Sequence, residues 1–293
     1  MKITLLLCLF IAFFCSPASL AGEKKAFLFP PLLSLLLPGW DQWWENQNQT
    51  AAAYTGSALA GLTITSLAVN SGDKVTSDGL LSEDDRARWA VLGGQIYFTA
   101  GLLSARESFR YAYQTRKEDF AFLTAEESTW DVLKAPFRFE FITRPSTFIP
   151  LLGIVGILAY EIHAGHEKFH SLTGGDLFFT TAFSYGAGTG EEAFFRGYLL
   201  PVAQHYTGER YVSNTLQALL FAFAHRITPL PWIQFLGGWW SGFVTQENGG
   251  SIAESVFEHF WWDMLAFSAY YLTKDRTHIQ PPPLRLPPIV VRF

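Results

Sequence analysis

The stretch LFFTTAFSYGAGTGEEAFFRGYLLPV, residues 177–202, decides the expected fold. Its length suits a helix that crosses the hydrocarbon core of a bilayer, which takes about 20 apolar residues. A glycine-rich segment over residues 186–190 is expected to break the helix, which then resumes. Two glutamates and an arginine follow directly, although ionisable groups are costly inside a membrane. The stretch therefore predicts a membrane helix with functional side chains.

Other apolar windows along the chain are also close to the length of a membrane span. They are Ala51–Val69, Trp89–Ser104, Thr147–Tyr160, Val212–His225, Pro231–Thr245 and Ile252–Leu272. The sequence thus predicts an all-α, polytopic helical membrane protein with about seven spans. A hydrophobic fraction of 49% with a mean hydropathy of only +0.15 fits apolar helices joined by long polar loops.

Residues 1–21 have the pattern of a cleavable secretory signal. Lys2 precedes the apolar run Ile3–Phe14, and the small residues Ser19 and Ala21 stand where a signal peptidase reads the chain. An uncleaved anchor helix is the alternative, although the run is short for a span. Both cysteines lie in this segment, so the cleaved chain would have neither disulfides nor thiol catalysis.

The distribution of charge predicts an orientation in the membrane. The loop Asn70–Arg88 is acid-rich, whereas Ala105–Pro145 holds seven of the 21 basic residues. By the positive-inside rule the second loop is cytoplasmic and the first is external. The net charge of -5 gives no general basic surface, which argues against nucleic acid as a partner. We expect an integral protein of the bacterial inner (cytoplasmic) membrane, with the lipid bilayer as a partner.

The first group of ionisable residues inside a predicted span is Glu191-Glu192-x-x-x-Arg196. On a helix Glu192 and Arg196 stand on one face and can form a structural ion pair, while Glu191 points about 100° away and lacks that partner. Glu191 is then the carboxylate left for chemistry. Simple charge placement at a helix start is the alternative interpretation.

Two further groups contain histidine. His225 follows Phe221-Ala222-Phe223-Ala224 at the end of an apolar helix, where a lone histidine is more often a satisfied interfacial residue than a catalyst. His259 and Asp263 lie well inside the last predicted span, and their i,i+4 spacing places them on one face among aromatic residues. Polar pairs in a membrane usually face an interior cavity, so this pair is a candidate for function.

In order and spacing, these groups resemble the motifs of the CPBP family, the CAAX-protease and bacteriocin-processing group that includes type II CAAX prenyl endopeptidases. The motifs are Glu191-Glu192-x-x-x-Arg196, Phe221-x-x-x-His225 and His259-x-x-x-Asp263. The resemblance implies a glutamate-dependent intramembrane endopeptidase in which Glu191 and His225 activate a water molecule. It implies that His259 and the residue at position 263 stabilise the oxyanion.

Asp263 is a departure from the family pattern. Many prenyl endopeptidases of the family carry asparagine there, and an ionised aspartate cannot donate a hydrogen bond to an oxyanion. Three roles stay open at this point. Asp263 is protonated, or it orients His259, or it holds a metal together with Glu191, His225 and His259.

A competing motif, His166-Glu167-x-x-His170, has the spacing of two zinc ligands with a glutamate base between them. Glu191 or Glu192 would supply a third ligand. The motif follows a span and runs into a glycine-containing loop, which favours a chance match. The leading hypothesis therefore requires no cofactor, and a divalent metal, zinc, belongs to the alternative.

The chain divides into four predicted regions. They are a signal peptide at residues 1–21, an N-terminal membrane region at 22–146, a CPBP-like protease domain at 147–272 and a proline-rich tail at 273–293. Within the second region, Phe27–Trp40 is short and broken by prolines, which fits an interfacial or re-entrant segment, or an ordinary hydrophobic loop. The expected substrate is a membrane-associated or exported peptide or protein. A non-catalytic membrane scaffold or immunity-type protein of the same fold is the alternative function.

Overall fold

A computed structural model describes residues 28–69, 85–115, 124–165, 171–225 and 232–273. These residues are helical apart from short connections, and no strand occurs in those ranges. The expected all-α fold is therefore confirmed for them. The predicted signal at residues 1–21, the zinc motif at 166–170 and the tail beyond residue 273 lie outside the described residues.

Fourteen helical elements occur among the described residues. They are α2 (Phe29–Leu36), α3 (Trp40–Trp44), α4 (Asn48–Val69), α5 (Asp85–Thr115), α6 (Thr129–Lys134), the 3₁₀ turns η5 (Ala135–Phe137) and η6 (Phe139–Thr143), α7 (Pro145–Gly165), α8 (Gly174–Phe194), the π-helix η7 (Phe195–Leu199), α9 (Leu200–Thr207), α10 (Arg210–Ala224), α11 (Trp232–Glu247) and α12 (Ala253–Thr273).

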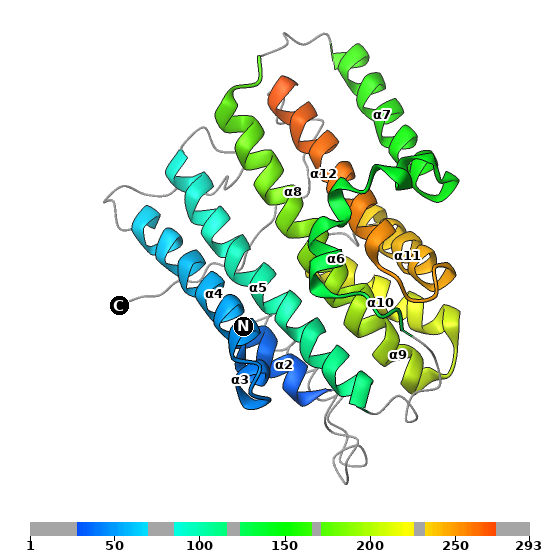
Figure 1. Ribbon diagram of the computed structural model, residues 1–293. Helices are drawn as coiled ribbons and strands as arrows, with labels where there is room; N and C mark the ends of the chain where they lie inside the picture. Colours follow the sequence, from blue (N-terminus) through cyan, green and yellow to red (C-terminus); the bar gives the residue numbers. More distant parts are fainter. Residues whose placement is uncertain (1–27, 70–84, 116–123, 166–170, 226–231, 274–293) are drawn as a thin grey trace.

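The long helices α4, α5, α8, α12 and α7 lie side by side in that order and form a layer (Figure 1). Helix α2 packs on α5, and α10 packs against both α9 and α11. Helix α11 also contacts α12, and η7 contacts α10. As a result, the end of α8, the end of α10 and the middle of α12 can meet in one region.

The predicted glycine break at residues 186–190 does not occur, because α8 continues through it to Phe194. Close packing explains these glycines. A Cβ atom on Gly188 would lie 3.0 Å from the backbone nitrogen of Phe260 in α12. One on Gly190 would lie 3.2 Å from the Cα atom of Thr99 in α5. Glycine lets two backbones approach this closely, so the run brings α8 against both of its neighbours.

The start of α8 is held by a reciprocal cap. The Asp176 amide donates to Thr173 Oγ1 at 3.1 Å, and the Thr173 amide donates to Asp176 Oδ2 at 2.9 Å. Arg88 of α5 adds an ion pair at 3.1 Å. Burial raises the pKa of Asp176, but the hydrogen bonds from Thr173 and the charge of Arg88 outweigh it and hold that pKa below its ordinary value.

Two buried apolar clusters fix the other end of α8. One contains Phe194 with Phe109 of α5 and Phe221 of α10, and the other contains Ala193 with Phe257 of α12. Each fully buried phenylalanine stabilises the fold by roughly 1.5–3 kcal/mol. Because consecutive residues enter different clusters, the segment that follows the two glutamates has little freedom to rotate.

One helix, α4, is long and apolar enough to cross a membrane among the described residues, with a mean hydropathy of 1.3 and 17% of its apolar window buried. A shorter apolar helix runs over Pro145–Tyr160 in α7. The other predicted windows fall in helices as well, apart from His225 and Ile252, which lie just outside α10 and α12, and Pro231, which lies outside the described residues. The helical state of these windows is confirmed, and the count of seven spans stays a prediction.

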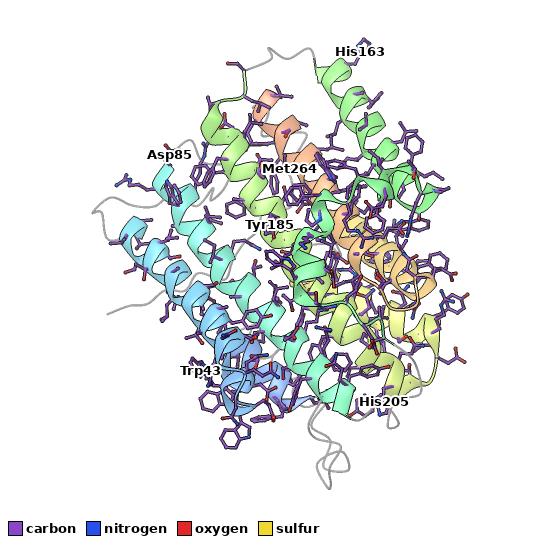
Figure 2. All side chains as sticks on the ribbon, viewed as in Figure 1. Trp43, Asp85, His163, Tyr185, His205 and Met264 are labelled. Carbon is purple, nitrogen blue, oxygen red and sulfur yellow. The ribbon has the colours of Figure 1, made fainter. Side chains whose placement is uncertain are left out.

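The segment Phe27–Trp40 forms short helices from residue 28 onward, α2 being followed by α3. An eight-residue helix rises only about 12 Å, so α2 does not cross a bilayer. The side chains of Trp43 and Trp44 are exposed, and Figure 2 shows Trp43 projecting from the surface. This arrangement is compatible with the interfacial segment that we expect from the sequence.

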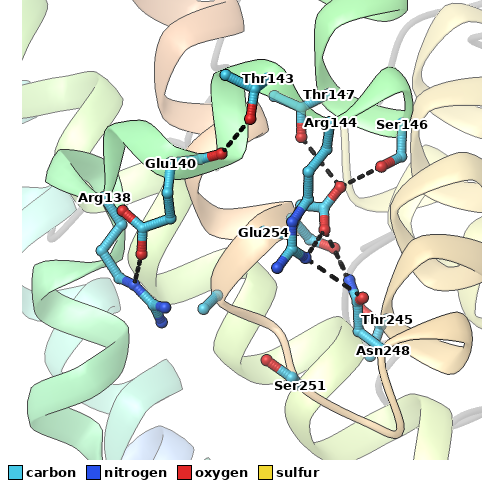
Figure 3. Close-up of polar contacts among 12 residues, drawn as sticks. Arg138, Glu140, Thr143, Arg144, Ser146, Thr147, Thr245, Asn248, Ser251 and Glu254 are labelled. Atoms are coloured by element: carbon cyan, nitrogen blue, oxygen red, sulfur yellow. Dashed lines mark hydrogen bonds and ion pairs between the residues drawn. The ribbon is translucent and has the colours of Figure 1, made fainter.

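Glu254 at the start of α12 links three parts of the fold (Figure 3). Its carboxylate accepts hydrogen bonds from Arg144 Nη1 at 2.5 Å, from Asn248 Nδ2 at 2.9 Å and from Thr147 Oγ1 at 3.1 Å, and from Ser146 Oγ. The residue itself is only 1% exposed. Glu254 therefore ties the connection into α7 and the turn after α11 to α12.

We expect Glu254→Ala to lower the free energy of unfolding by about 2–4 kcal/mol, since it leaves several buried donors unpaired while Arg144 stays half-exposed. Chemical unfolding of the purified chain in detergent measures this loss. Glu140→Ala, which removes an exposed carboxylate paired with Arg138, is the matched control. Equal stability of the two variants would contradict the linking role of Glu254.

Candidate active site

Glu191 and Glu192 lie in the last turn of α8, directly before the π-helix η7. The amide of Phe195 donates to the carbonyls of both glutamates. Pro201 has no N–H to donate to the Gly197 carbonyl, so a regular α-helix would lose a hydrogen bond at this point. Single turns of π-helix often occur at functional sites.

The structure brings the predicted pair of Glu192 and Arg196 together. Arg196 Nη1 lies 2.9 Å from Glu192 Oε1, and the two side chains are 1% and 0% exposed. Arg196 Nη2 donates to the carbonyl of Gly238 in α11 at 3.1 Å. The guanidinium carbon lies 4.3 Å from the ring centroid of Phe221, in a cation–π contact. The pair thus joins α8, η7, α10 and α11.

Glu192 has a second partner that the sequence does not reveal. His259 Nδ1 lies 2.7 Å from Glu192 Oε1, the same oxygen that accepts from Arg196. This contact depends on the close crossing of α8 and α12 at Gly188. Glu192 therefore positions a candidate catalytic histidine as well as forming an ion pair.

Glu191 faces His225 at the end of α10, with 3.4 Å between Oε2 and Nε2. His225 Nδ1 lies 2.8 Å from the carbonyl oxygen of Phe221. A carbonyl can only accept, so Nδ1 carries a proton and donates it, which fixes the tautomer of the ring. His225 Nε2 and the Glu191 carboxylate can then share one proton between them.

His259 and Asp263 share a face of α12, as their spacing predicts. His259 Nε2 lies 3.6 Å from Asp263 Oδ2. With Nδ1 on Glu192, both ring nitrogens of His259 face carboxylate oxygens. A doubly protonated imidazolium can donate on both sides, so the arrangement suits a charged ring.

Exposure separates the residues into two classes. The side chains of Glu191, His225, His259 and Asp263 keep 12%, 15%, 13% and 21% exposure, whereas those of Glu192 and Arg196 keep 0% and 1%. The first four side chains are partly accessible to solvent, whereas the last two are fully buried. The Phe221 ring joins the two histidines, with its centroid 4.4 Å from that of His225 and 6.0 Å from that of His259.

Residues 173–265 match the family described as type II CAAX prenyl endopeptidase Rce1-like. We call this matched part of the chain the Rce1-like segment. It begins at the residue that caps α8 and ends within α12, so it contains all six predicted site residues. The family implies a CAAX protease-type intramembrane endopeptidase, which agrees with the resemblance drawn from the motifs. No curated protein and no solved structure matched the chain.

The residues that could hold a metal ion in the Rce1-like segment are the two histidines and the carboxylates beside them. Among the residues that the structure describes, no group of three or more His, Cys, Asp or Glu side chains is arranged to hold a metal ion. His225 Nδ1 and His259 Nδ1 are taken up by Phe221 and Glu192, and the remaining nitrogens each face one carboxylate.

Sequence reasoning missed one buried carboxylate in the Rce1-like segment. Glu258 precedes His259 in α12, is 6% exposed, and its Oε2 atom has no hydrogen-bond partner. An acidic residue inside a predicted span is the signal that would have found it, by the criterion that identified Asp263.

Proposed function

We propose that this chain is an intramembrane endopeptidase in which Glu191 and His225 activate a water molecule for attack on a peptide carbonyl. The observation that carries the proposal is the contact of 3.4 Å between Glu191 Oε2 and His225 Nε2, with the other ring nitrogen fixed by the Phe221 carbonyl. A carboxylate and a histidine of fixed tautomer are suited to accept a proton from water. The Rce1-like match supports the same reaction class.

Glu191 and His225 would accept and return the proton that this reaction transfers. Water gives one proton to Glu191 and His225 as its oxygen bonds to the carbonyl carbon of the peptide, which forms a tetrahedral oxyanion. The carbon–nitrogen bond then breaks, and the pair returns a proton to the leaving amine. The products are a carboxyl terminus and a free amino terminus, and no step requires a further reactant.

His259 is proposed to stabilise the oxyanion as a positive charge. Glu192 holds one side of the ring at 2.7 Å, and Asp263 faces the other at 3.6 Å. In this role Asp263 orients and neutralises the imidazolium and need not donate a hydrogen bond itself. The proposal thereby accounts for aspartate at a position where relatives carry asparagine.

Asp263→Asn keeps an oxygen acceptor toward His259, so we expect kcat/KM to stay within about tenfold of wild type. Asp263→Leu removes the acceptor, and we expect a loss of about a hundredfold. Initial rates of peptide cleavage measure both. An equal loss in the two variants would contradict the orienting role.

We also propose that the helices span a membrane, as the sequence predicts. Support comes from large apolar side chains exposed on α4, α7 and α11, such as Leu67 at 70%, Ile149 at 63% and Ile233 at 68%. Apolar patches of this kind are rare on soluble monomers and suit contact with lipid. The orientation with residues 105–145 in the cytoplasm, and the inner-membrane location, follow from the sequence alone.

The test is cleavage of peptides by the purified full-length chain in neutral detergent. The mixture contains membrane-derived peptides, with and without a prenyl group, and mass spectrometry identifies new termini. We expect cleavage that persists after treatment with a chelator. A folded protein that cleaves none of the peptides, or activity lost on chelation and restored by zinc, would contradict the proposal in its present form.

A further inference from the structure

A cavity of about 230 Å³ has Arg196 in its wall but not Glu192, the carboxylate that pairs with this arginine. We call it the arginine pocket, because Arg106, Arg110, Arg196 and Arg210 all line it. Its walls come from α5, α9, the start of α10 and the turn after α11. No acidic side chain lines it among the described residues. His205 on α9 marks this end of the molecule, opposite His163 (Figure 2).

Several N–H groups on the walls of the arginine pocket have no acceptor. Arg106 is 3% exposed, and its Nε and Nη1 atoms are buried without a hydrogen-bond partner. Arg196 Nε is also buried and unpaired. An unsatisfied buried donor costs about 1–3 kcal/mol. In native structures most buried donors therefore have an acceptor from the protein, a ligand or a water molecule.

The neighbouring residues do not supply the missing acceptors. Arg106 Nη2 donates to the Glu127 carbonyl at 3.2 Å and lies 3.6 Å from its carboxylate, which leaves the other two nitrogens unpaired. Burial, and then the nearby charge of Arg110, lower the pKa of Arg106 to about 10. Burial and Arg110 thus outweigh the charges of Glu127 and Glu107, which act in the opposite direction.

Gly197 places the unpaired side of Arg106 at the cavity wall. A Cβ atom on Gly197 would lie 2.7 Å from both Cδ and Nε of Arg106, so only glycine leaves room for this guanidinium. Gly197 itself lines the arginine pocket. The donors of Arg106 and Arg196 therefore approach one cavity from α5 and η7.

The geometry points to an anionic ligand, and we propose that the arginine pocket binds an oxyanion of the phosphate class. Each arginine of the pocket pairs with one carboxylate outside the lining, but Nε and Nη1 of Arg106 and Nε of Arg196 still lack an acceptor. An anionic ligand in the cavity would supply the acceptor oxygens that these three nitrogen atoms need. Guanidinium forks match phosphate oxygens in bidentate contacts. The source is either a phospholipid headgroup or free phosphate. This binding is independent of the proposed hydrolysis.

The first experiment titrates the purified full-length chain with inorganic phosphate at constant ionic strength, with chloride as the replacement anion. We expect a saturable rise in Tm, since a ligand of the folded state stabilises it. Arg106→Gln and Arg110→Gln are expected to weaken phosphate binding by roughly ten- to a hundredfold. Arg110 is less buried than Arg106, so its variant serves if Arg106→Gln does not fold. Arg138→Gln removes an exposed arginine outside the pocket and is the matched control.

A second arm separates the two sources. Native mass spectrometry compares phosphatidic acid with a diacylglycerol of the same acyl chains. Phosphatidic acid that binds and is displaced by inorganic phosphate assigns a headgroup, whereas phosphate binding that the lipid does not share assigns the free ion. The proposal is overturned if neither binds, if acetate competes as well as phosphate, or if both pocket variants bind like Arg138→Gln. The Glu191→Gln variant is expected to bind phosphate and phosphatidic acid like wild type, because the proposed binding does not depend on hydrolysis.

Discussion

Glu191→Gln is expected to reduce kcat/KM for peptide hydrolysis by about 10²–10⁴-fold, the range for loss of a general base. Glutamine keeps the shape of the side chain but cannot accept the proton of water. It also removes the charge that faces His225 Nε2 at 3.4 Å. Initial cleavage rates of the peptide that wild type cuts fastest measure the loss.

The control for this variant is Glu140→Gln, which removes a carboxylate that is exposed and paired with Arg138. It is expected to hydrolyse the peptide like wild type. Equal stability of the two variants in thermal unfolding would show that the loss is chemical. Activity in Glu191→Gln equal to that of Glu140→Gln would overturn the assignment of Glu191 as the base.

The largest effect on stability is expected from Arg196→Met. Removing the arginine takes one of the two partners from the fully buried Glu192 carboxylate and leaves only His259, and breaking a buried ion pair costs about 3–5 kcal/mol. The variant also loses the hydrogen bond to the Gly238 carbonyl and the contact with the Phe221 ring. Chemical unfolding in detergent measures the change, and Arg138→Met is the control at an exposed pair.

The double variant Arg196→Met with Glu192→Leu tests the reason for that loss. Replacing both partners by apolar groups removes the uncompensated charge, so part of the stability should return. Recovery should be incomplete, because His259 Nδ1 then loses its partner at 2.7 Å. A double variant less stable than Arg196→Met alone would contradict this account of the pair.

Local spacing made part of this site predictable. Four residues on a helix bring side chains to one face, so the approach of Arg196 to Glu192, and of Asp263 to His259, follows from the sequence. The positions of the long helices follow in the same way from apolar windows. These inferences need no knowledge of how separate helices pack.

Contacts between distant helices were not predictable. The contact between Glu192 and His259 depends on how closely α8 and α12 cross at Gly188, where the sequence suggested a break in the helix. The unpaired guanidinium of Arg106 belongs to a segment that the sequence shows only as a basic loop. The spacing of residues along a helix can be read from one sequence. The angle and distance at which two helices cross depend on all the side chains at their interface.

The central claim is tested most directly by measuring kcat/KM for Glu191→Gln and Glu167→Gln side by side on one peptide. Glu167 is the base that the competing zinc motif would use. We expect kcat/KM of Glu191→Gln to fall by about 10²–10⁴-fold while that of Glu167→Gln stays near wild type. An inactive Glu167→Gln beside an active Glu191→Gln would contradict the central claim.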